Sequence, residues 1–355
     1  MTVIWPAKEA KNIIVRMPNW LGDCVMATPL LYDLHRRYPT ARMTVMCQKN
    51  VAPLLEKDPT VDEIFSFKRP SGWLHSEQHQ DIIGALRHGE FDLGILTTNS
   101  FSSAWWFWRG HVKNRLGYRG NLRSFMLDKA LPLPENVEQQ HLVITYKMLL
   151  VPLGIPISDT PLSLYVTDKE REAAIALLKS YGCNVGEHTV VGINPGAAYG
   201  SAKCWLPERF EQVTRRLLED PDTYIVYFGD PAGAPLVNAI CNEMPKRVIN
   251  LAGKTSIREL MALTSCCSAF LSNDSGPMHI AAALKVPLVA LFGSTSDVKT
   301  RPYQHGTVIH KHVSCSPCYK RVCPIDFRCM TRIEVDEVCN EILAQINQTK
   351  LKVVK

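Results

Sequence analysis

The chain alternates between short apolar runs and amphipathic stretches of helical periodicity, and it does so in two successive series. Short apolar runs between polar turns are typical of buried strands, and a helix between consecutive strands is typical of a parallel sheet covered on both faces. The sequence therefore predicts an α/β fold. The expected strands cover residues 12–17, 43–47, 63–67 and 93–98 in the first series, and 189–194, 224–228, 248–250, 269–271 and 286–292 in the second.

Two series of this kind fit a chain of 355 residues, which is long enough for two domains. Residues 119–139 are polar and weakly patterned, so we expect a loop there, and the proline-containing segment 152–161 is expected to link the domains. We predict a first domain over residues 1–160, a second over 161–333, and a final helix within 334–355 that packs back toward the first domain. Two doubly wound, Rossmann-like domains are expected to face one another across a ligand-binding cleft.

Charge and composition narrow the classes of partner. A net charge of +6 is mildly basic, which favours anionic ligands without requiring nucleic acid. No stretch approaches the roughly 20 apolar residues of a membrane-spanning helix, and residues 1–11 lack the apolar centre of a signal peptide. We therefore expect a cytoplasmic protein that at most rests on a membrane surface, with its 12 cysteines reduced.

The most informative motif follows the fourth expected strand of the second series. It reads Asn-Asp-Ser-Gly-Pro-Met-His over residues 273–279 and leads into an alanine-rich helical stretch. Small polar residues at such a junction leave backbone N–H groups open at a helix start, where they and the helix dipole bind phosphate. The alternative is an ordinary helix cap formed by Asp274 or Ser275. The local pattern leaves both interpretations open. In the phosphate-binding interpretation, Gly276 and His279 also belong to the candidate site.

Two other strand ends of the second series carry glycine and small residues. Gly196, Ala197 and Ala198 follow one strand, and Gly229 follows the next. Lys203 lies in the loop after the first of these, where a lysine neutralises phosphate as a point charge; the alternative is a solvated surface lysine. The chain has no P-loop signature and no glycine fingerprint of dinucleotide binding after a strand, which argues against ordinary nucleoside triphosphatase or dehydrogenase chemistry.

The loop after the first expected strand contains Asn19, Trp20, Gly22 and Asp23. Asp23 lies at the start of the following helix, so a capping or first-turn role is one interpretation. The other makes its carboxylate a general base in the cleft, with Gly22 allowing a substrate close to the backbone.

Four consecutive aromatic residues at 105–108 lie close in sequence to several arginines, among them Arg115, Arg119 and Arg123. An aromatic and basic surface suits an anionic, lipid-linked partner at a membrane interface. The alternative places at least two of the aromatic side chains in the core of the protein.

Four of the cysteines, Cys315, Cys318, Cys323 and Cys329, cluster in one segment. Four thiols this close together are a candidate structural zinc site. Their spacing departs from two paired C-x2-C motifs, which favours the alternative of a free-thiol loop that helps to line the cleft.

In this order the motifs resemble those of the bacterial heptosyltransferases, glycosyltransferase family 9. The resemblance extends from about residue 12 to residue 336, and its cysteine loop is most similar to that of the members that add the second heptose. The matching segments are residues 16–23, 195–205, 251–255 and 273–279.

The resemblance implies a GT-B fold and an inverting, metal-independent transfer without a cofactor. The donor would be ADP-heptose, and the acceptor would be a lipid A–Kdo core carrying its first heptose at the cytoplasmic face of the inner membrane, with no nucleic-acid partner. Asp23 would deprotonate the acceptor hydroxyl, and Lys203 would stabilise the leaving diphosphate. The other donor-binding residues would be Gly196, Ala197, Ala198, Gly229, Gly253, Lys254, Asp274, Ser275, Gly276 and His279. The acceptor-binding residues would be Asn19, Trp20, Gly22, Arg115, Arg119 and Arg123.

Two other functions stay open at this point. One is a related glycosyltransferase with another nucleotide sugar or acceptor, and the other is a non-catalytic protein that binds nucleotide or lipopolysaccharide. The segment after Gly229 begins with Asp230 and Pro231, which leaves open which residue contacts the ribose of ADP.

Overall fold

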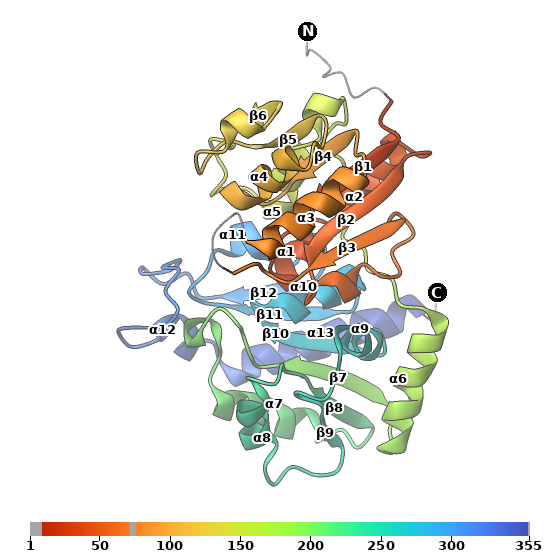
Figure 1. The fold of residues 1–355 in the computed structure, drawn as a ribbon. Coiled ribbons are helices and arrows are strands. Elements are labelled where there is room, and N and C mark those ends of the chain that lie inside the picture. The colour runs from red at the N-terminus through yellow and green to blue at the C-terminus, as the bar shows by residue number, and fades with distance from the viewer. Residues whose placement is uncertain (1–8, 72–75, 354–355) are drawn as a thin grey trace. The chain divides into compact units, whose positions relative to one another are not determined.

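The computed structural model describes residues 9–71 and 76–353 and is drawn in Figure 1. Contacts within the chain divide it into two compact units, unit 1 (Met1–Tyr165) and unit 2 (Val166–Lys355). The division falls a few residues after the position expected from the sequence. Residues 1–8, which belong to the segment considered for a signal peptide, lie outside the described ranges.

In its described residues, unit 1 has a six-stranded parallel sheet in the order β3-β2-β1-β4-β5-β6. The first strand lies in the middle, and strands are added first on one side of it and then on the other. This is the strand order of a Rossmann fold. The strands are β1 (Asn12–Arg16), β2 (Arg42–Gln48), β3 (Glu63–Phe67), β4 (Leu93–Leu96), β5 (Arg115–Tyr118) and β6 (Lys129–Leu131).

Helices of unit 1 pack against each other and against this sheet. Helices α3 and α4 are in contact, and their apolar side chains Ile83 and Phe107 share a core with Ile14 and Leu96 of the sheet. Helices α1, α2 and α5 form a second contacting group. The helices are α1 (Leu21–Met26), α2 (Thr28–Arg37), α3 (Glu77–His88), α4 (Phe101–Arg109) and α5 (Leu142–Met148), with short 3-10 turns η1 (Ala52–Leu54), η2 (Ser124–Met126) and η3 (Val151–Leu153).

Unit 2, over its described residues, repeats the same strand order, with a parallel sheet arranged β12-β11-β10-β7-β8-β9. The order reverses between β7 and β10, and ligands of doubly wound sheets bind at the carboxyl ends of the strands at such a point. The strands are β7 (Thr189–Asn194), β8 (Thr223–Tyr227), β9 (Val248–Asn250), β10 (Ala269–Asn273), β11 (Leu288–Phe292) and β12 (Thr307–His310).

Side chains alternate between the two faces of the unit 2 sheet, as they must along any strand. On β10, Ala269 and Leu271 join the core that holds Phe210 of α7, whereas Phe270 between them stacks on Phe228 at 5.8 Å between ring centroids. The helices are α6 (Asp168–Ser180), α7 (Pro207–Leu217), α8 (Ala234–Cys241), α9 (Ile257–Thr264), α10 (Gly276–Ala283), α11 (Asp297–Thr300), α12 (Arg328–Thr331) and α13 (Val335–Val353), with the 3-10 turn η4 (Ser201–Lys203).

The final helix, α13, packs on α7 and beside β10 and β11 of unit 2. It contributes buried side chains, among them Val338 and Ile342, to the core of that sheet. Its contacts therefore make it part of unit 2, and the expected packing toward the first domain stays a prediction.

Every strand expected from the sequence is present, and the α/β class is confirmed. Three strands were missed: β5, β6 and β12. The expectation of a loop over residues 119–139 is wrong in part, because β6 lies there. These strands have only three or four residues, and β5 includes an arginine and a glycine, so no apolar run marks them.

None of the helices within residues 9–71 and 76–353 combines the length and apolarity needed to span a membrane.

A partly buried ion pair connects two helices of unit 2. Glu170 in the first turn of α6 accepts hydrogen bonds from Arg258 of α9 at 2.7 and 2.6 Å. The same carboxylate accepts from the Thr167 backbone N–H at 2.8 Å, completing a capping box at the start of α6. The Arg258 hydrogen bond is the largest cause that lowers the pKa of Glu170 to about 2.

We predict that Glu170→Gln lowers the free energy of unfolding of unit 2 by about 2 kcal/mol at neutral pH, because a charged hydrogen-bond network is lost. In the natural chain this stabilisation is present above the ordinary carboxyl pKa of 4.5 and is lost as the pH falls toward about 2. The variant should lack this part of the pH dependence. Urea unfolding followed by circular dichroism over this pH range measures both effects, with exposed Glu172→Gln on the same helix as the control.

Candidate functional site

The loop after β10 leaves the start of α10 open. Ser275 is the N-cap residue, but in the described chain its hydroxyl makes no capping bond to the helix. That hydroxyl instead lies 2.9 Å from the Ser272 hydroxyl and accepts a hydrogen bond from the Asn194 amide at 3.2 Å. The side chain is thereby held away from the first-turn N–H groups, which begin at Gly276. The geometry favours the anion-binding interpretation over the ordinary side-chain cap.

Two asparagine side chains hold this loop to the loop after β7. Asn273 is fully buried, donates to the Pro195 carbonyl at 2.6 Å and accepts from the Trp205 backbone N–H at 3.0 Å. Asn194 donates to the Gly196 carbonyl at 2.9 Å as well as to Ser275. The segment with Gly196, Ala197 and Ala198 and the segment 274–279 are therefore held side by side, where β7 and β10 are neighbours in the sheet.

Lys203 and Asp274 form a close ion pair beside the open helix start. The Lys203 Nζ lies 2.6 Å from Asp274 Oδ2, and the side chains are only 14% and 5% exposed. The Thr295 hydroxyl donates to the same carboxylate oxygen at 2.6 Å. Lys203 is thus no free surface lysine. No motif in the sequence points to Thr295, which lies 21 residues further along the chain than Asp274.

His279 lies one turn into α10 and is 3% exposed. Its expected contact with the donor stays a prediction.

The loop that carries Lys203 packs against the cysteine segment. Tyr199 donates to the Tyr319 carbonyl at 2.7 Å, and its ring lies 5.3 Å from Lys203 Nζ and 5.4 Å from the Arg321 guanidinium. Gly200 has a φ of 154°, and a Cβ there would lie 2.4 Å from the Arg321 carbonyl oxygen. This close approach requires glycine, because any side chain would displace one of the two loops.

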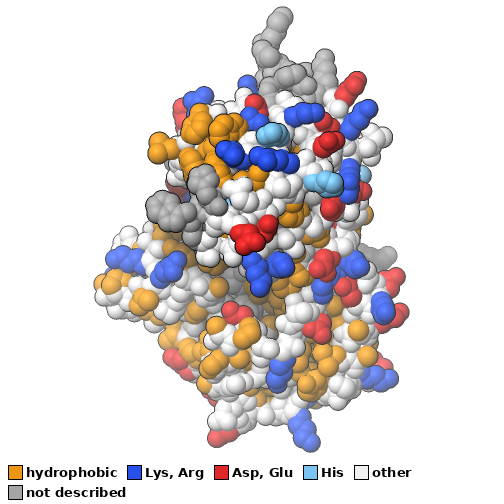
Figure 2. Space-filling model, in the orientation of Figure 1, with side chains coloured by type: hydrophobic (Ala, Val, Ile, Leu, Met, Phe, Trp, Pro, Cys, Tyr) orange, Lys and Arg blue, Asp and Glu red, His pale blue; other side chains and the backbone are white. Residues whose placement is uncertain are grey.

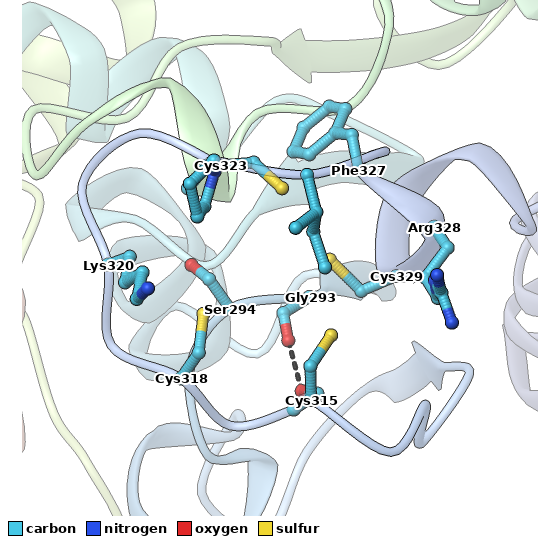
Figure 3. Close-up of a pocket in the computed structure, with 13 residues that line it drawn as sticks. Gly293, Ser294, Cys315, Cys318, Lys320, Cys323, Phe327, Arg328 and Cys329 are labelled. Carbon is cyan, nitrogen blue, oxygen red and sulfur yellow. Dashed lines mark hydrogen bonds between the residues drawn. The ribbon is translucent and has the colours of Figure 1, made fainter.

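The four clustered cysteines surround a pocket of about 100 Å³ in unit 2 (Figure 3). Cys315, Cys318, Cys323 and Cys329 are free thiols, and burial is the largest cause that raises the pKa of Cys329. Over the described residues, these sulfur atoms do not form a group of three ligand atoms within 4.8 Å of one another. The thiols therefore line a pocket and are not arranged to hold a metal ion in this conformation.

The remaining expected donor residues lie at the ends of β8 and β9. The Gly253 N–H donates to the Gly229 carbonyl at 2.9 Å, and Gly253 has a φ of 70°, a backbone conformation that favours glycine. The Lys254 amine donates to the Asn250 carbonyl at 3.0 Å. Asp230 accepts from the Gly233 N–H at 2.7 Å, which closes the turn before α8.

In unit 1 the loop after β1 is ordered by a buried arginine. Arg16 is 2% exposed, donates to Asn19 Oδ1 at 2.6 Å and to the Met17 carbonyl, and lies 4.8 Å from the centre of the Phe67 ring. Burial lowers its pKa to about 10. Trp20, which follows Asn19 in this loop, is 58% exposed and directly precedes α1.

Asp23 lies in the first turn of α1 and is half-buried. Its carboxylate is close enough to Tyr146 and Cys24 to act on both electrostatically. Burial is the largest cause that raises the pKa of each of these groups, and the charge of Asp23 adds to both shifts. The helical position is as expected, and a role as general base stays a prediction.

Two arginines expected to bind an acceptor make several hydrogen bonds within unit 1, and acceptor binding by Arg115 stays a prediction. Arg123 is fully buried and donates to Tyr118, Thr98 and Asn99, which occupies its guanidinium in bracing the loop after β4. Burial lowers the pKa of Arg123 to about 10.

Arg115 pairs with Asp128 at 3.0 Å and donates to two carbonyls, those of Met126 and Val112. Arg119 is exposed, with its Nε donating to the Ala130 carbonyl.

Three of the four consecutive aromatic residues belong to the core. Trp105, Trp106 and Phe107 are at most 7% exposed, which confirms the core alternative for them. Trp108 is 43% exposed and packs edge-on against Phe125, which is 71% exposed.

Comparison with known proteins identifies the family of this chain. The sequence model of glycosyltransferase family 9 (heptosyltransferase) matches residues 80–327. The chain belongs to this family. Lipopolysaccharide heptosyltransferase 2 of Escherichia coli K12 is 30% identical over 306 residues, covering 83% of this chain and 86% of that protein. Lipooligosaccharide heptosyltransferase 2 of Campylobacter jejuni (serotype O:2) is 27% identical over 341 residues, covering 93% and 97%.

Solved structures of family 9 proteins share the fold. The structure of Escherichia coli ADP-heptose lipopolysaccharide heptosyltransferase II matches with a TM-score of 0.79 at 26% identity, covering 96% of this chain and 99% of that one. The two Rossmann-like units are those of a GT-B glycosyltransferase, as the resemblance of the motifs implied.

We predict that Lys203 and Asp274 are strongly coupled in stability. Lys203→Met or Asp274→Asn alone leaves a largely buried charge without its partner, which costs about 3 kcal/mol. The double variant should cost less than the sum of the two, with a coupling of about 1–3 kcal/mol. Urea unfolding of the four proteins measures the cycle. The exposed pair Arg42–Glu63, at 2.8 Å, is the control and should show less than about 1 kcal/mol. Additive costs at 203 and 274 would contradict the prediction.

Proposed function

We propose that this protein transfers L-glycero-D-manno-heptose from ADP-heptose to the first heptose of the lipopolysaccharide inner core. The observation that carries the proposal is the open start of α10 beside the Lys203–Asp274 pair, at the strand-order reversal of unit 2. The relatives named heptosyltransferase 2, which match this chain over most of its length, support the choice of sugar and acceptor.

The proposal assigns donor binding to unit 2. Backbone N–H groups from Gly276 onward and the Lys203 ammonium stabilise the diphosphate as it leaves the anomeric carbon, so that no metal ion is required there. Asp274, itself held by Thr295, orients the Lys203 amine. Gly196, Ala197 and Ala198 bring the neighbouring backbone close to the donor, and the strand-end residues Gly229, Gly253 and Lys254 complete the nucleotide side of the site.

The proposal assigns acceptor binding and the general base to unit 1. Inversion needs a base on the acceptor hydroxyl, on the side of the anomeric carbon opposite to the leaving group. Asp23 supplies this carboxylate from the first turn of α1, next to a loop that Arg16 and Asn19 keep ordered. Gly22 lets the acceptor approach the backbone, and exposed Trp20 offers an apolar face to a sugar ring.

We predict that Asp23→Asn lowers kcat of heptose transfer by a factor of about 100–10,000, because the positioned base is lost. Its affinity for ADP should stay unchanged. Lys203→Met should weaken ADP binding as well as kcat, because the charge on the diphosphate is lost. Transfer from ADP-heptose to a singly heptosylated lipid A–Kdo acceptor, followed by mass spectrometry, measures kcat, and calorimetry measures ADP binding.

Exposed Asp81→Asn on α3 is the matched control in unit 1. Near-normal turnover of Asp23→Asn would overturn the base assignment. Tighter binding of UDP or GDP than of ADP would point to another nucleotide sugar, and tight ADP binding without any turnover would point to a non-catalytic binding protein.

The exposed apolar side chains of unit 1 offer a surface for the membrane that carries the acceptor. Trp108, Leu122 and Phe125 are 43%, 87% and 71% exposed, and Arg119 lies close to them in the chain. Figure 2 shows hydrophobic side chains gathered beside Lys and Arg side chains, over the region where Figure 1 labels α4, β5 and β6. Large apolar and basic side chains together bind the interface of an anionic bilayer. We propose that this surface binds the cytoplasmic face of the inner membrane.

We predict that the double variant Leu122→Ser, Phe125→Ser binds anionic lipid vesicles about tenfold or more weakly. The reason is that two large apolar side chains are no longer available to transfer from water into the bilayer. Turnover on a water-soluble acceptor fragment should not change. Vesicle sedimentation measures binding, with Leu343→Ser on α13, which is 46% exposed in the natural chain, as the control. Equal binding of the double variant and the natural protein would exclude this surface.

A further inference from the structure

Three potential metal ligands meet at the carboxyl ends of β11 and β12. Asp297 begins α11 shortly after β11, His310 is the last residue of β12, and His312 follows two residues later. The two strands are neighbours, so their carboxyl ends lie at the same edge of the sheet. One ligand atom from each side chain lies within 4.8 Å of the other two. The donor and base residues assigned above do not include any of the three.

The distances within the cluster suit a shared ion. His310 Nδ1 lies 3.3 Å from Asp297 Oδ1, and His312 Nε2 lies 3.4 Å from Asp297 Oδ2. Ligand atoms on one tetrahedral zinc ion, each at about 2.0–2.1 Å from it, are separated by about 3.3 Å. His312 adopts a left-handed backbone with φ 43°, which is uncommon for a residue other than glycine.

The hydrogen bonds of His310 direct its second nitrogen at Asp297. The Ser316 hydroxyl donates to the Gly293 carbonyl, so its oxygen accepts from His310 Nε2 at 2.9 Å. His310 Nδ1 then faces the Asp297 carboxylate at 3.3 Å, where a proton or a metal ion on that nitrogen would join the two groups. The His310 side chain is 2% exposed.

We propose that Asp297, His310 and His312 bind a divalent transition-metal ion of the zinc type. Two imidazoles and one carboxylate are a ligand set that zinc accepts together with one water molecule. Ser316 supplies the hydrogen bond to the far nitrogen of His310, which fixes the tautomer and orientation of a metal-bound histidine.

The ion would order the loops beside the Lys203–Asp274 pair. It connects the start of α11 to the end of β12 and, through Ser316, to Gly293. Two residues after Gly293, Thr295 donates to Asp274. The role is structural, and it does not depend on the proposed heptosyl transfer.

Metal binding by the full-length protein tests the proposal. Protein stripped with a chelator should take up one zinc ion per chain, measured by calorimetry and elemental analysis. His312→Asn should weaken zinc binding about 100-fold or more, and Ser316→Ala about tenfold. The control is His111→Asn. Like His312, His111 is exposed and has a left-handed backbone conformation, with φ 56°, and Asn tolerates that conformation. His111→Asn should bind zinc as the natural chain does.

Cobalt substitution separates this cluster from the cysteine pocket. Cobalt bound to Asp297, His310 and His312 should show visible ligand-field bands without a thiolate-to-cobalt charge-transfer band. Cys318→Ser should leave that spectrum unchanged. A thiolate band that Cys318→Ser removes, zinc binding that His312→Asn does not weaken, or no zinc uptake by the natural chain would each overturn the proposal. Circular dichroism of His312→Asn checks that the variant is folded, and these readouts do not use transferase activity.

Discussion

The candidate site of unit 2 depends on one buried amide. The Asn273 side chain, at the end of β10, holds both the Pro195 carbonyl and the Trp205 backbone N–H. A buried amide without its partners would cost about 1–3 kcal/mol, so the two loops are strongly constrained to stay together. Because they do, Lys203 reaches Asp274, and the start of α10 stays next to the loop after β7.

The proposed function gives the same residues both structural and ligand-binding roles. Ser275 ends the loop before α10, yet its hydroxyl is bonded to Ser272 and Asn194 and makes no capping bond to the helix. Asp274 is the buried partner of Lys203 and the acceptor of Thr295. In unit 1, Arg16 orders the loop that leads to Asp23 by donating to Asn19. Such supporting contacts hold in place the groups to which the proposed function assigns catalysis.

The sequence predicted these parts because they are local. The motif 273–279 and the loop with Lys203 each follow an apolar run, and parallel strands bring their carboxyl ends to one edge. Arg123 was expected to bind the acceptor because it lies close in sequence to the aromatic residues 105–108 and to other arginines. It is buried because the carbonyls of Tyr118 and Thr98 surround it, and those lie up to 25 residues away.

The sequence by itself determined the doubly wound α/β class, most of the strands and the family, because periodicity and short motifs are written in neighbouring residues. Only the tertiary structure decided which aromatic side chains are buried, that Thr295 holds Asp274, and that Asp297 meets His310 and His312. The physical reason is that these contacts join elements far apart in the chain. Their geometry follows from the register and twist of the sheet and from how the helices pack on it, which no local stretch of sequence specifies.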